Sequence, residues 1–257
     1  MATVTSPDGT VVGFETCGDG PPMVLVHGTA ADHTRWTTVR DRLARRYRLY
    51  LVDRRGRGLS RAEAPGYDIR REGEDIAAVA EAAGGDVYLL AHSYGALCAL
   101  EAVRITTAVS RLVAYEPPRP KPGEPVVGPD ARHRMRTAED PEEVLEIFLR
   151  EALRLTPAAV EAMRGTPVWQ ARVAAAHTIP RELDVVEAMV FDDRLAEIAV
   201  PTRLFAGTES PGYLRLAAEE VARRIPGADV VPLPGQAHQA MDFDPDGFAD
   251  AVFAFGG

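Results

Sequence analysis

Short apolar runs rich in Val, Leu and Tyr alternate along the 257-residue chain with segments of helical periodicity. Such runs are typical of strands buried on both faces of a mainly parallel sheet, and the intervening helices cover those faces. We expect seven strands, at residues 10–15, 23–26, 48–52, 86–90, 111–115, 202–206 and 229–233. Helices are predicted near residues 36–44, 71–83, 94–104, 212–224 and 246–255. The pattern therefore predicts an α/β protein with a mostly parallel central sheet flanked by helices.

The interval between residues 115 and 202 interrupts this alternation, because it contains no convincing strand. It begins with the Pro-rich segment 117–129, which proline keeps out of a helix. Four predicted helices follow, at residues 141–155, 157–164, 168–176 and 181–189, and the first two begin with Pro, a favoured first helical residue. We therefore expect residues 118–199 to form a helical cap or lid, inserted into a core domain made of residues 1–117 and 200–257.

The sharpest local signal is an apolar strand that runs directly into a helix with Ser93 at the turn. A G-x-S-x-G turn of this kind presents a serine hydroxyl as a nucleophile, and it needs small residues two positions before and after the serine. Gly95 meets that demand, whereas Ala91 stands where the pattern usually has Gly. On these residues alone, a buried serine that merely caps the helix is an equally good interpretation.

Four further segments, in the same order along the chain, extend the pattern beyond this turn. They are residues 24–29 (VLVHGT), 53–60 (DRRGRGLS), 201–207 (PTRLFAG) and 233–238 (LPGQAH). Together with the serine turn they resemble the α/β-hydrolase family, and the similarity extends over nearly the whole chain. The resemblance implies the α/β-hydrolase fold, with a helical cap inserted after the sixth strand.

The resemblance also implies a serine mechanism. A serine hydroxyl is a poor nucleophile until a neighbouring imidazole removes its proton, and His238 in the loop after the last strand is the candidate base for Ser93. In the family, backbone N–H groups hold the negative oxygen that develops during attack, and the matching positions are Thr29 and Tyr94.

Two acidic residues compete for the third position of the triad. Most of the family has an Asp three residues after the Gly of the strand that follows the cap, but here that position is Ser210, and Glu209 lies one residue out of register. In haloalkane dehalogenases the acid instead lies at the end of the strand that follows the helix after the nucleophile turn, and this chain has Glu116 at that position. We favour Glu116, because a carboxylate at a buried strand end needs a partner such as an imidazolium. Glu209 stays as the alternative acid, and a dyad or another group as the remaining option.

Candidate substrate-binding residues are His27 and Gly28 in the early loop, together with the aromatic residues Trp36 and Trp169. Half or more of the chain's candidate pocket aromatics are expected in the core instead.

Composition and charge limit the classes of molecule that the protein is expected to bind. A net charge of -9 and a pI near 5.2 argue against nucleic acid, because phosphate binding needs a concentrated basic surface. Cys17 and Cys98 have no metal-ligand spacing and do not make a disulfide framework, so we expect no metal and no cofactor. The first ten residues have neither the basic start nor the apolar core expected of a signal peptide, and no apolar run reaches the roughly 18 residues expected of a membrane span. We expect a cytoplasmic monomer or homodimer that acts on a small molecule.

The sequence thus predicts a serine hydrolase that cleaves an ester, lactone or thioester through an acyl-enzyme. One alternative keeps the fold and triad for a lyase, cyclisation or acyl-transfer reaction. Another is a ligand-binding protein with little turnover, since fold alone does not establish function.

Overall fold

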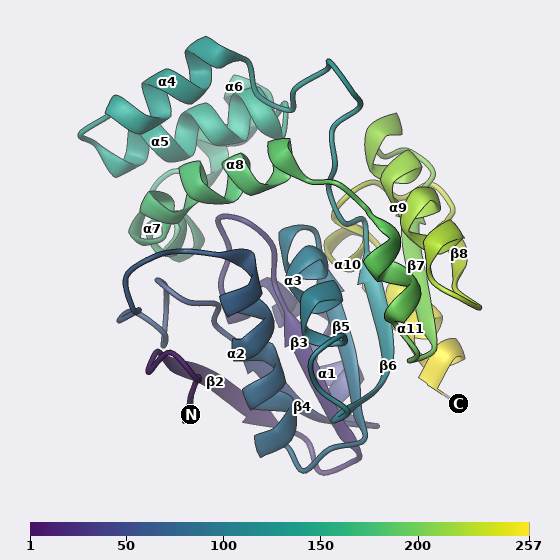
Figure 1. Cartoon of the computed structure of the whole chain (residues 1–257). Helices are drawn as coiled ribbons and strands as arrows, with labels where there is room; N and C mark the ends of the chain where they lie inside the picture. Colours follow the sequence, from purple (N-terminus) through teal and green to yellow (C-terminus); the bar gives the residue numbers. More distant parts are fainter. Residues whose placement is uncertain (257) are drawn as a thin grey trace.

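The computed structural model describes residues 1–256 and contains one eight-stranded sheet with the order β1-β2-β4-β3-β5-β6-β7-β8 (Figure 1). The strands are β1 (Ala2–Thr5), β2 (Val11–Cys17), β3 (Pro22–Val26), β4 (Arg48–Val52), β5 (Val87–His92), β6 (Val109–Tyr115), β7 (Thr202–Gly207) and β8 (Asp229–Leu233). β2 pairs antiparallel with β1 and β4, and the remaining pairs are parallel. The predicted α/β class and mostly parallel sheet are confirmed.

The sequence analysis missed β1, the four-residue edge strand Ala2–Thr5. Most of its residues are exposed, so it lacks the apolar run by which the buried strands are recognised. The other seven strands begin and end within two residues of their predicted bounds.

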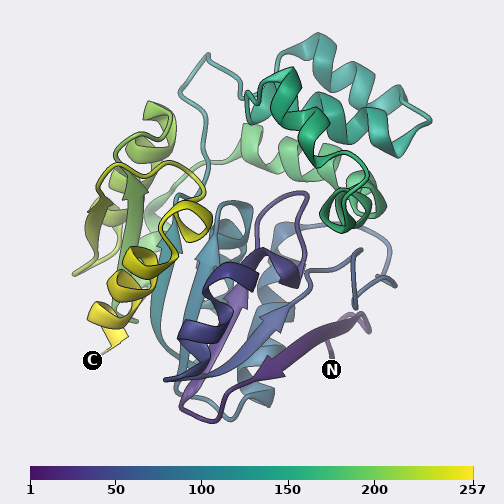
Figure 2. The same ribbon diagram turned by 180° about the vertical axis from the view of Figure 1, so that it is seen from behind.

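Helices cover both faces of the sheet, as Figures 1 and 2 show from opposite sides. One face carries α2 (Ile69–Ala82), α3 (Tyr94–Ala102) and α9 (Gly212–Arg224), and the other carries α1 (Thr37–Ala44), α10 (Ala240–Phe243) and α11 (Pro245–Gly256). Side chains of a strand alternate between the two faces. In β3, Val24 and Val26 accordingly pack in the first core, and Met23 and Leu25 pack in the second.

Between β6 and β7 the chain forms helices and loops alone, which lie over one edge of the sheet (Figures 1 and 2). The helices are α4 (Pro129–Thr137), α5 (Pro141–Ile147), α6 (Pro157–Met163), α7 (Pro167–Ala174) and α8 (Ile179–Ala188). Each has a proline in its first turn, where the missing N–H costs no helical hydrogen bond. Shorter turns complete the chain: η1 (His33–Trp36), η2 (Phe148–Ala152), η3 (Ala176–Thr178) and η4 (Asp193–Glu197).

This helical segment has a hydrophobic core of its own, which includes Leu145, Phe148, Trp169 and Leu183. α4 was not predicted, because only Ala131 and Met135 are buried in a helix that is otherwise polar. From Val186 onward the segment returns to the main core, where Phe191, Leu195 and Ile198 are buried with the residues of α2 and α3. Within residues 1–256, no helix combines the length and apolar character that a bilayer crossing needs.

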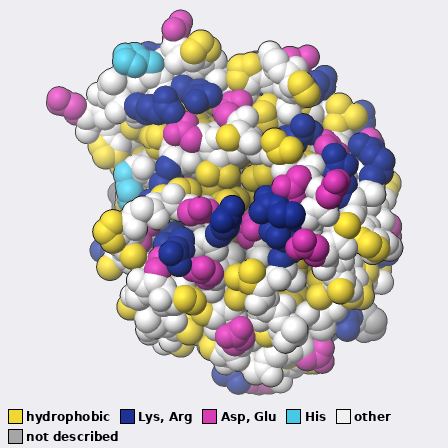
Figure 3. Space-filling model, in the orientation of Figure 1, with side chains coloured by type: hydrophobic (Ala, Val, Ile, Leu, Met, Phe, Trp, Pro, Cys, Tyr) yellow, Lys and Arg dark blue, Asp and Glu magenta, His cyan; other side chains and the backbone are white. Residues whose placement is uncertain are grey.

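On the face drawn in Figure 3, Lys and Arg side chains lie among Asp and Glu side chains. That face therefore presents no concentrated basic surface of the kind that binds phosphate backbones.

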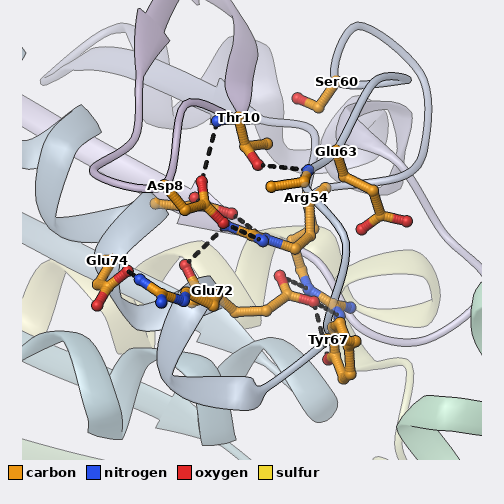
Figure 4. A network of polar contacts seen from close by, with 12 residues as sticks. Asp8, Thr10, Arg54, Ser60, Glu63, Tyr67, Glu72 and Glu74 are labelled. Carbon is orange, nitrogen blue, oxygen red and sulfur yellow. Dashed lines mark hydrogen bonds and ion pairs between the residues drawn. The ribbon is translucent and has the colours of Figure 1, made fainter.

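A buried ion cluster connects the helical segment to the core. Arg54, in the loop after β4, donates to Glu72 of α2 at 2.7 Å and to Glu182 of α8 at 2.8 Å. Figure 4 shows Arg54 beside Glu72 and Tyr67, whose hydroxyl also donates to Glu72. Burial alone would raise the pKa of Glu182, but the guanidinium groups of Arg54 and Arg57 lower that pKa to about 2. A fully buried carboxylate thus stays ionised between two cations.

We predict that Glu182→Gln lowers the free energy of unfolding by about 3 kcal/mol, because it leaves two buried guanidinium groups short of a charged partner. Urea denaturation at neutral pH measures the change. Because the pKa of Glu182 is lower in the folded state, its contribution is present above the unfolded pKa of 4.5 and is lost as the pH falls through about 2. The control is Glu219→Gln on the exposed side of α9, expected to cost less than about 0.5 kcal/mol. Equal losses in the two variants would contradict the prediction.

Candidate active site

Ser93 lies at the turn between β5 and α3, with φ 57° and ψ -126°. A positive φ is strained for a residue with a side chain, and such strain persists only where the surroundings hold it. Here the Ser93 N–H donates to the carbonyl of Tyr115 at 2.8 Å, and the Ser93 carbonyl accepts from Ala96 at 2.8 Å. The backbone of the turn is therefore fixed from both sides.

Two glycines allow the early loop to approach this turn. A Cβ atom on Gly95 would lie 2.4 Å from the carbonyl oxygen of His27, and one on Gly28 would lie 2.8 Å from Cβ of Ser93. Both distances are shorter than real Cβ contacts. Ala91, at the position where the pattern usually has Gly, is completely buried. The packing around Ser93 thus depends on the absence of side chains at residues 28 and 95.

The imidazole of His238 faces Glu116. Nδ1 of His238 lies 2.5 Å from Oε2 of Glu116, and Oε1 of the same carboxylate accepts from the Gly207 N–H at 2.7 Å. Glu116 is completely buried at the end of β6. Since a carboxylate only accepts, Nδ1 carries the hydrogen, which leaves Nε2 of the neutral ring as a proton acceptor.

Glu209 lies away from this pair. It is exposed in the loop after β7, and its side chain makes a contact of 3.4 Å with the Thr208 hydroxyl. Ser210, at the usual position of the acid, is buried, and its hydroxyl has no partner among the described residues. Of the two candidate acids, the structure brings Glu116 to His238.

Two side chains, His92 and Tyr115, hold the loop of His238, a role that the sequence did not predict for them. Nε2 of His92 donates to the His238 carbonyl at 2.8 Å, and the Tyr115 hydroxyl donates to the Ala237 carbonyl and accepts from Ala240 N–H. Burial lowers the pKa of His92 well below its ordinary value, so its ring is neutral. His92 and Tyr115 directly precede Ser93 and Glu116 at the ends of adjacent strands. This sequence position could have indicated that both side chains lie near the site.

Ser93, His238, Gly28 and Thr29 line one cavity of about 70 Å³ between the sheet and the helical segment. The helical segment supplies apolar side chains to it, among them Phe148, Leu153, Leu183 and Val186. Within residues 1–256, neither the Thr29 N–H nor the Tyr94 N–H donates to another protein group. The N–H of Tyr94 belongs to the first turn of α3, where helical amides have no intrahelical acceptor.

Of the four expected substrate-binding residues, Gly28 lines this cavity and the other three do not. Trp36 is completely buried in the core between the sheet and α1. Trp169 is buried in the core of the helical segment, where it donates to Glu142. His27 is buried and accepts from the Arg54 N–H at 3.2 Å. Burial and the charges of Arg57 and Arg54 lower the pKa of His27 to about 3. The structure thus does not bring these three residues to the cavity, because residue type does not reveal the direction of a side chain.

The profile of the family described as "Alpha/beta hydrolase family" matches residues 23–251. The chain belongs to the alpha/beta hydrolase family. The predicted family and fold are thereby confirmed.

Two solved structures are similar over the whole chain. An alpha/beta hydrolase from Sphaerobacter thermophilus is 35% identical, with a TM-score of 0.87 and complete coverage of both chains. The esterase RhEst1 from Rhodococcus sp. ECU1013 is 28% identical, with a TM-score of 0.78, and the match covers 99% of this chain and 97% of that one.

The first curated relatives match over shorter stretches. N-formylmaleamate deformylase from Pseudomonas putida is 38% identical over 110 residues, which is 41% of each chain. The chain spans only 20% to 41% of the length of the first curated relatives that it matches.

We predict that Gly95→Ala lowers the free energy of unfolding of the protein by about 2 kcal/mol, because the added methyl group meets backbone carbonyl oxygens of residues 26 and 27. Gly212→Ala is the matched control, since a Cβ there has nothing within 4 Å. Urea denaturation compares the two, and a Gly95→Ala protein as stable as the Gly212→Ala protein would show that the turn tolerates a side chain.

Proposed function

We propose that this hydrolase cleaves an ester, lactone or thioester of a small organic molecule through an acyl-enzyme formed on Ser93. The observation that carries the proposal is the chain of groups around one cavity. Ser93, in its strained turn, shares the cavity with His238, and the far side of the imidazole is bonded to the buried Glu116. Nucleophile, base and orienting acid in this order are the elements of serine acyl transfer.

In the proposed mechanism, His238 takes the proton of the Ser93 hydroxyl while the serine oxygen attacks the carbonyl carbon. The negative oxygen of the tetrahedral intermediate accepts from the Thr29 and Tyr94 N–H groups, whose lack of protein acceptors supports this role. His238 then gives its proton to the leaving alcohol or thiol. A water molecule attacks the acyl-enzyme with His238 as base again, and the acid is released.

Glu116 orients the imidazole and stabilises the imidazolium that forms during attack. One of its oxygens is held by the Gly207 N–H, so the other is fixed toward Nδ1 of His238. Because Nδ1 is bonded to Glu116, Nε2 is the nitrogen that is left to accept the proton of Ser93.

The substrate class follows from the cavity and from relatives. The small volume and the apolar side chains from the helical segment favour a short acyl group, with residues 118–199 acting as a cap that limits water. The Rhodococcus esterase and the Pseudomonas deformylase both carry names of enzymes that hydrolyse a carbonyl derivative, which supports acyl transfer to water.

We predict that a fluorophosphonate probe labels the protein at Ser93 and that Ser93→Ala abolishes the label. The probe reacts with a serine whose proton a neighbouring base removes, so His238→Ala slows labelling by about a thousandfold or more. Ser110→Ala is the matched control, since Ser110 is a half-buried serine on β6 bonded to the Val87 carbonyl. Mass spectrometry of the labelled peptide reads the site, and label at the same level in Ser93→Ala would overturn the proposal.

The acid is tested by a pair of isosteric substitutions. Glu116→Gln replaces the carboxylate that faces Nδ1, so we expect kcat for short p-nitrophenyl esters to fall by about 10³- to 10⁴-fold. Glu209→Gln, on the exposed loop, should change kcat less than about threefold. Steady-state kinetics measure both, and the opposite ranking of the two variants would remove Glu116 from the triad.

A further inference from the structure

The cavity at Ser93 is cationic although the chain carries a net charge of -9. The arginines that line it are Arg35 and Arg172, and no Asp or Glu of residues 1–256 lines it. Arg35 comes from η1 in the core, and Arg172 comes from α7 in the helical segment. The two cations therefore come from different parts of the chain, the core and the helical segment.

Arg172 has no carboxylate partner in the described part of the chain, and its one polar contact is with the Met163 sulfur at 3.6 Å. Two other arginines of the helical segment differ: Arg164 pairs with three carboxylates, and Arg181 forms two hydrogen bonds with Glu63. Arg172 is nonetheless half-buried. Its guanidinium group is thus held at the cavity without a protein anion.

Arg35 is only partly satisfied. Its side chain is 10% exposed, and one end bonds to Asp242, while its Nε is buried without a partner. A buried donor without an acceptor is costly, and so are two like charges that share a partly dry site. Burial, followed by the charge of Arg35, lowers the pKa of Arg172. An anion placed between the two groups would relieve both costs.

Both arginines also line an outer groove, together with Asp32 and Asp242. They therefore stand at the boundary between this groove and the cavity of Ser93. Asp242 already binds Arg35, whereas the guanidinium group of Arg172 has no carboxylate partner among the described residues. An anionic group bound there lies at the outer end of the cavity, and the scissile carbonyl lies at the Ser93 end.

We propose that Arg172, assisted by Arg35, binds a carboxylate of the substrate, so that the hydrolase prefers esters of small molecules that carry a second, ionised carboxyl group. The planar guanidinium group matches a carboxylate in a two-bond arrangement, which makes Arg suited to this recognition. The proposal rests on the proposed function for the reaction at Ser93, but the binding site does not need the reaction.

Binding is tested without turnover in the Ser93→Ala protein. The probes are the half methyl esters of succinic, glutaric and adipic acid. Each is compared with the methyl ester in which a primary amide replaces the free carboxyl group; this amide has the same size and no charge. We expect calorimetry to show that at least one half ester binds about 10- to 100-fold more tightly than its amide. Arg172→Met removes this difference, and Arg215→Met, at an exposed arginine of α9, leaves it unchanged.

Arg172→Lys is a second variant, which keeps the charge but not the fork of donors and should retain part of the preference. Thermal unfolding of each variant checks that the protein is folded. Equal affinities of half esters and amides, no measurable binding of any half ester, or an unchanged preference in a folded Arg172→Met protein overturns the inference.

Kinetics on the wild-type enzyme separate this inference from the proposed function. The expected result is a kcat/KM for the preferred half ester that exceeds that of its amide by about 10- to 100-fold, with the excess absent in Arg172→Met. If Ser93 is labelled and both esters are cleaved equally well, the carboxylate site is wrong and the hydrolase stands. If nothing is cleaved or labelled but the binding difference persists, the hydrolase proposal fails and the site stands.

Discussion

The strained backbone at Ser93 is the constraint on which the site depends. A positive φ at a residue with a side chain is tolerated because β5 ends and α3 begins within one residue, and because hydrogen bonds to Tyr115 and Ala96 hold the turn. The loop after β3 packs directly on it, at positions where only glycine leaves enough room. The same close approach that stabilises the turn brings the N–H of Thr29 and the serine hydroxyl to one cavity.

The parallel sheet supplies the other groups because neighbouring strands end at the same edge. His92 of β5 is in register with Tyr115 of β6, and Tyr115 with Phe205 of β7, so the residues that follow these strands lie side by side. Ser93, Glu116 and the loop after Gly207 come from three adjacent strand ends. His238 lies in a longer loop after β8, outside the sheet. Hydrogen bonds from His92 and Tyr115 to the backbone of this loop fix the position of His238.

Buried charge joins the helical segment to this edge. Arg54 contacts Glu182 of α8 and also donates to the Gly28 carbonyl at 3.2 Å, so one guanidinium group binds both the helical segment and the early loop. The positive charge of Arg54 is neutralised, since the carboxylates of Glu72 and Glu182 both bind its guanidinium group. Arg172 at the cavity has no such counterpart, and this difference between a neutralised and an open cationic site underlies the inferred preference for a carboxylate.

The sequence by itself determined seven of the eight strand segments, the helical segment between residues 115 and 202, and the serine turn, because these depend on local patterns of apolar residues, glycine and proline. It also gave Glu116 and Glu209 as the two candidates for the acidic residue of the triad. Only the tertiary structure decided which carboxylate faces His238, since that depends on strand register and on the course of a loop more than a hundred residues away. For the same reason it placed Trp36 and Trp169 in cores and Arg172 at the cavity: the direction of a side chain is set by non-local packing, which residue type does not encode.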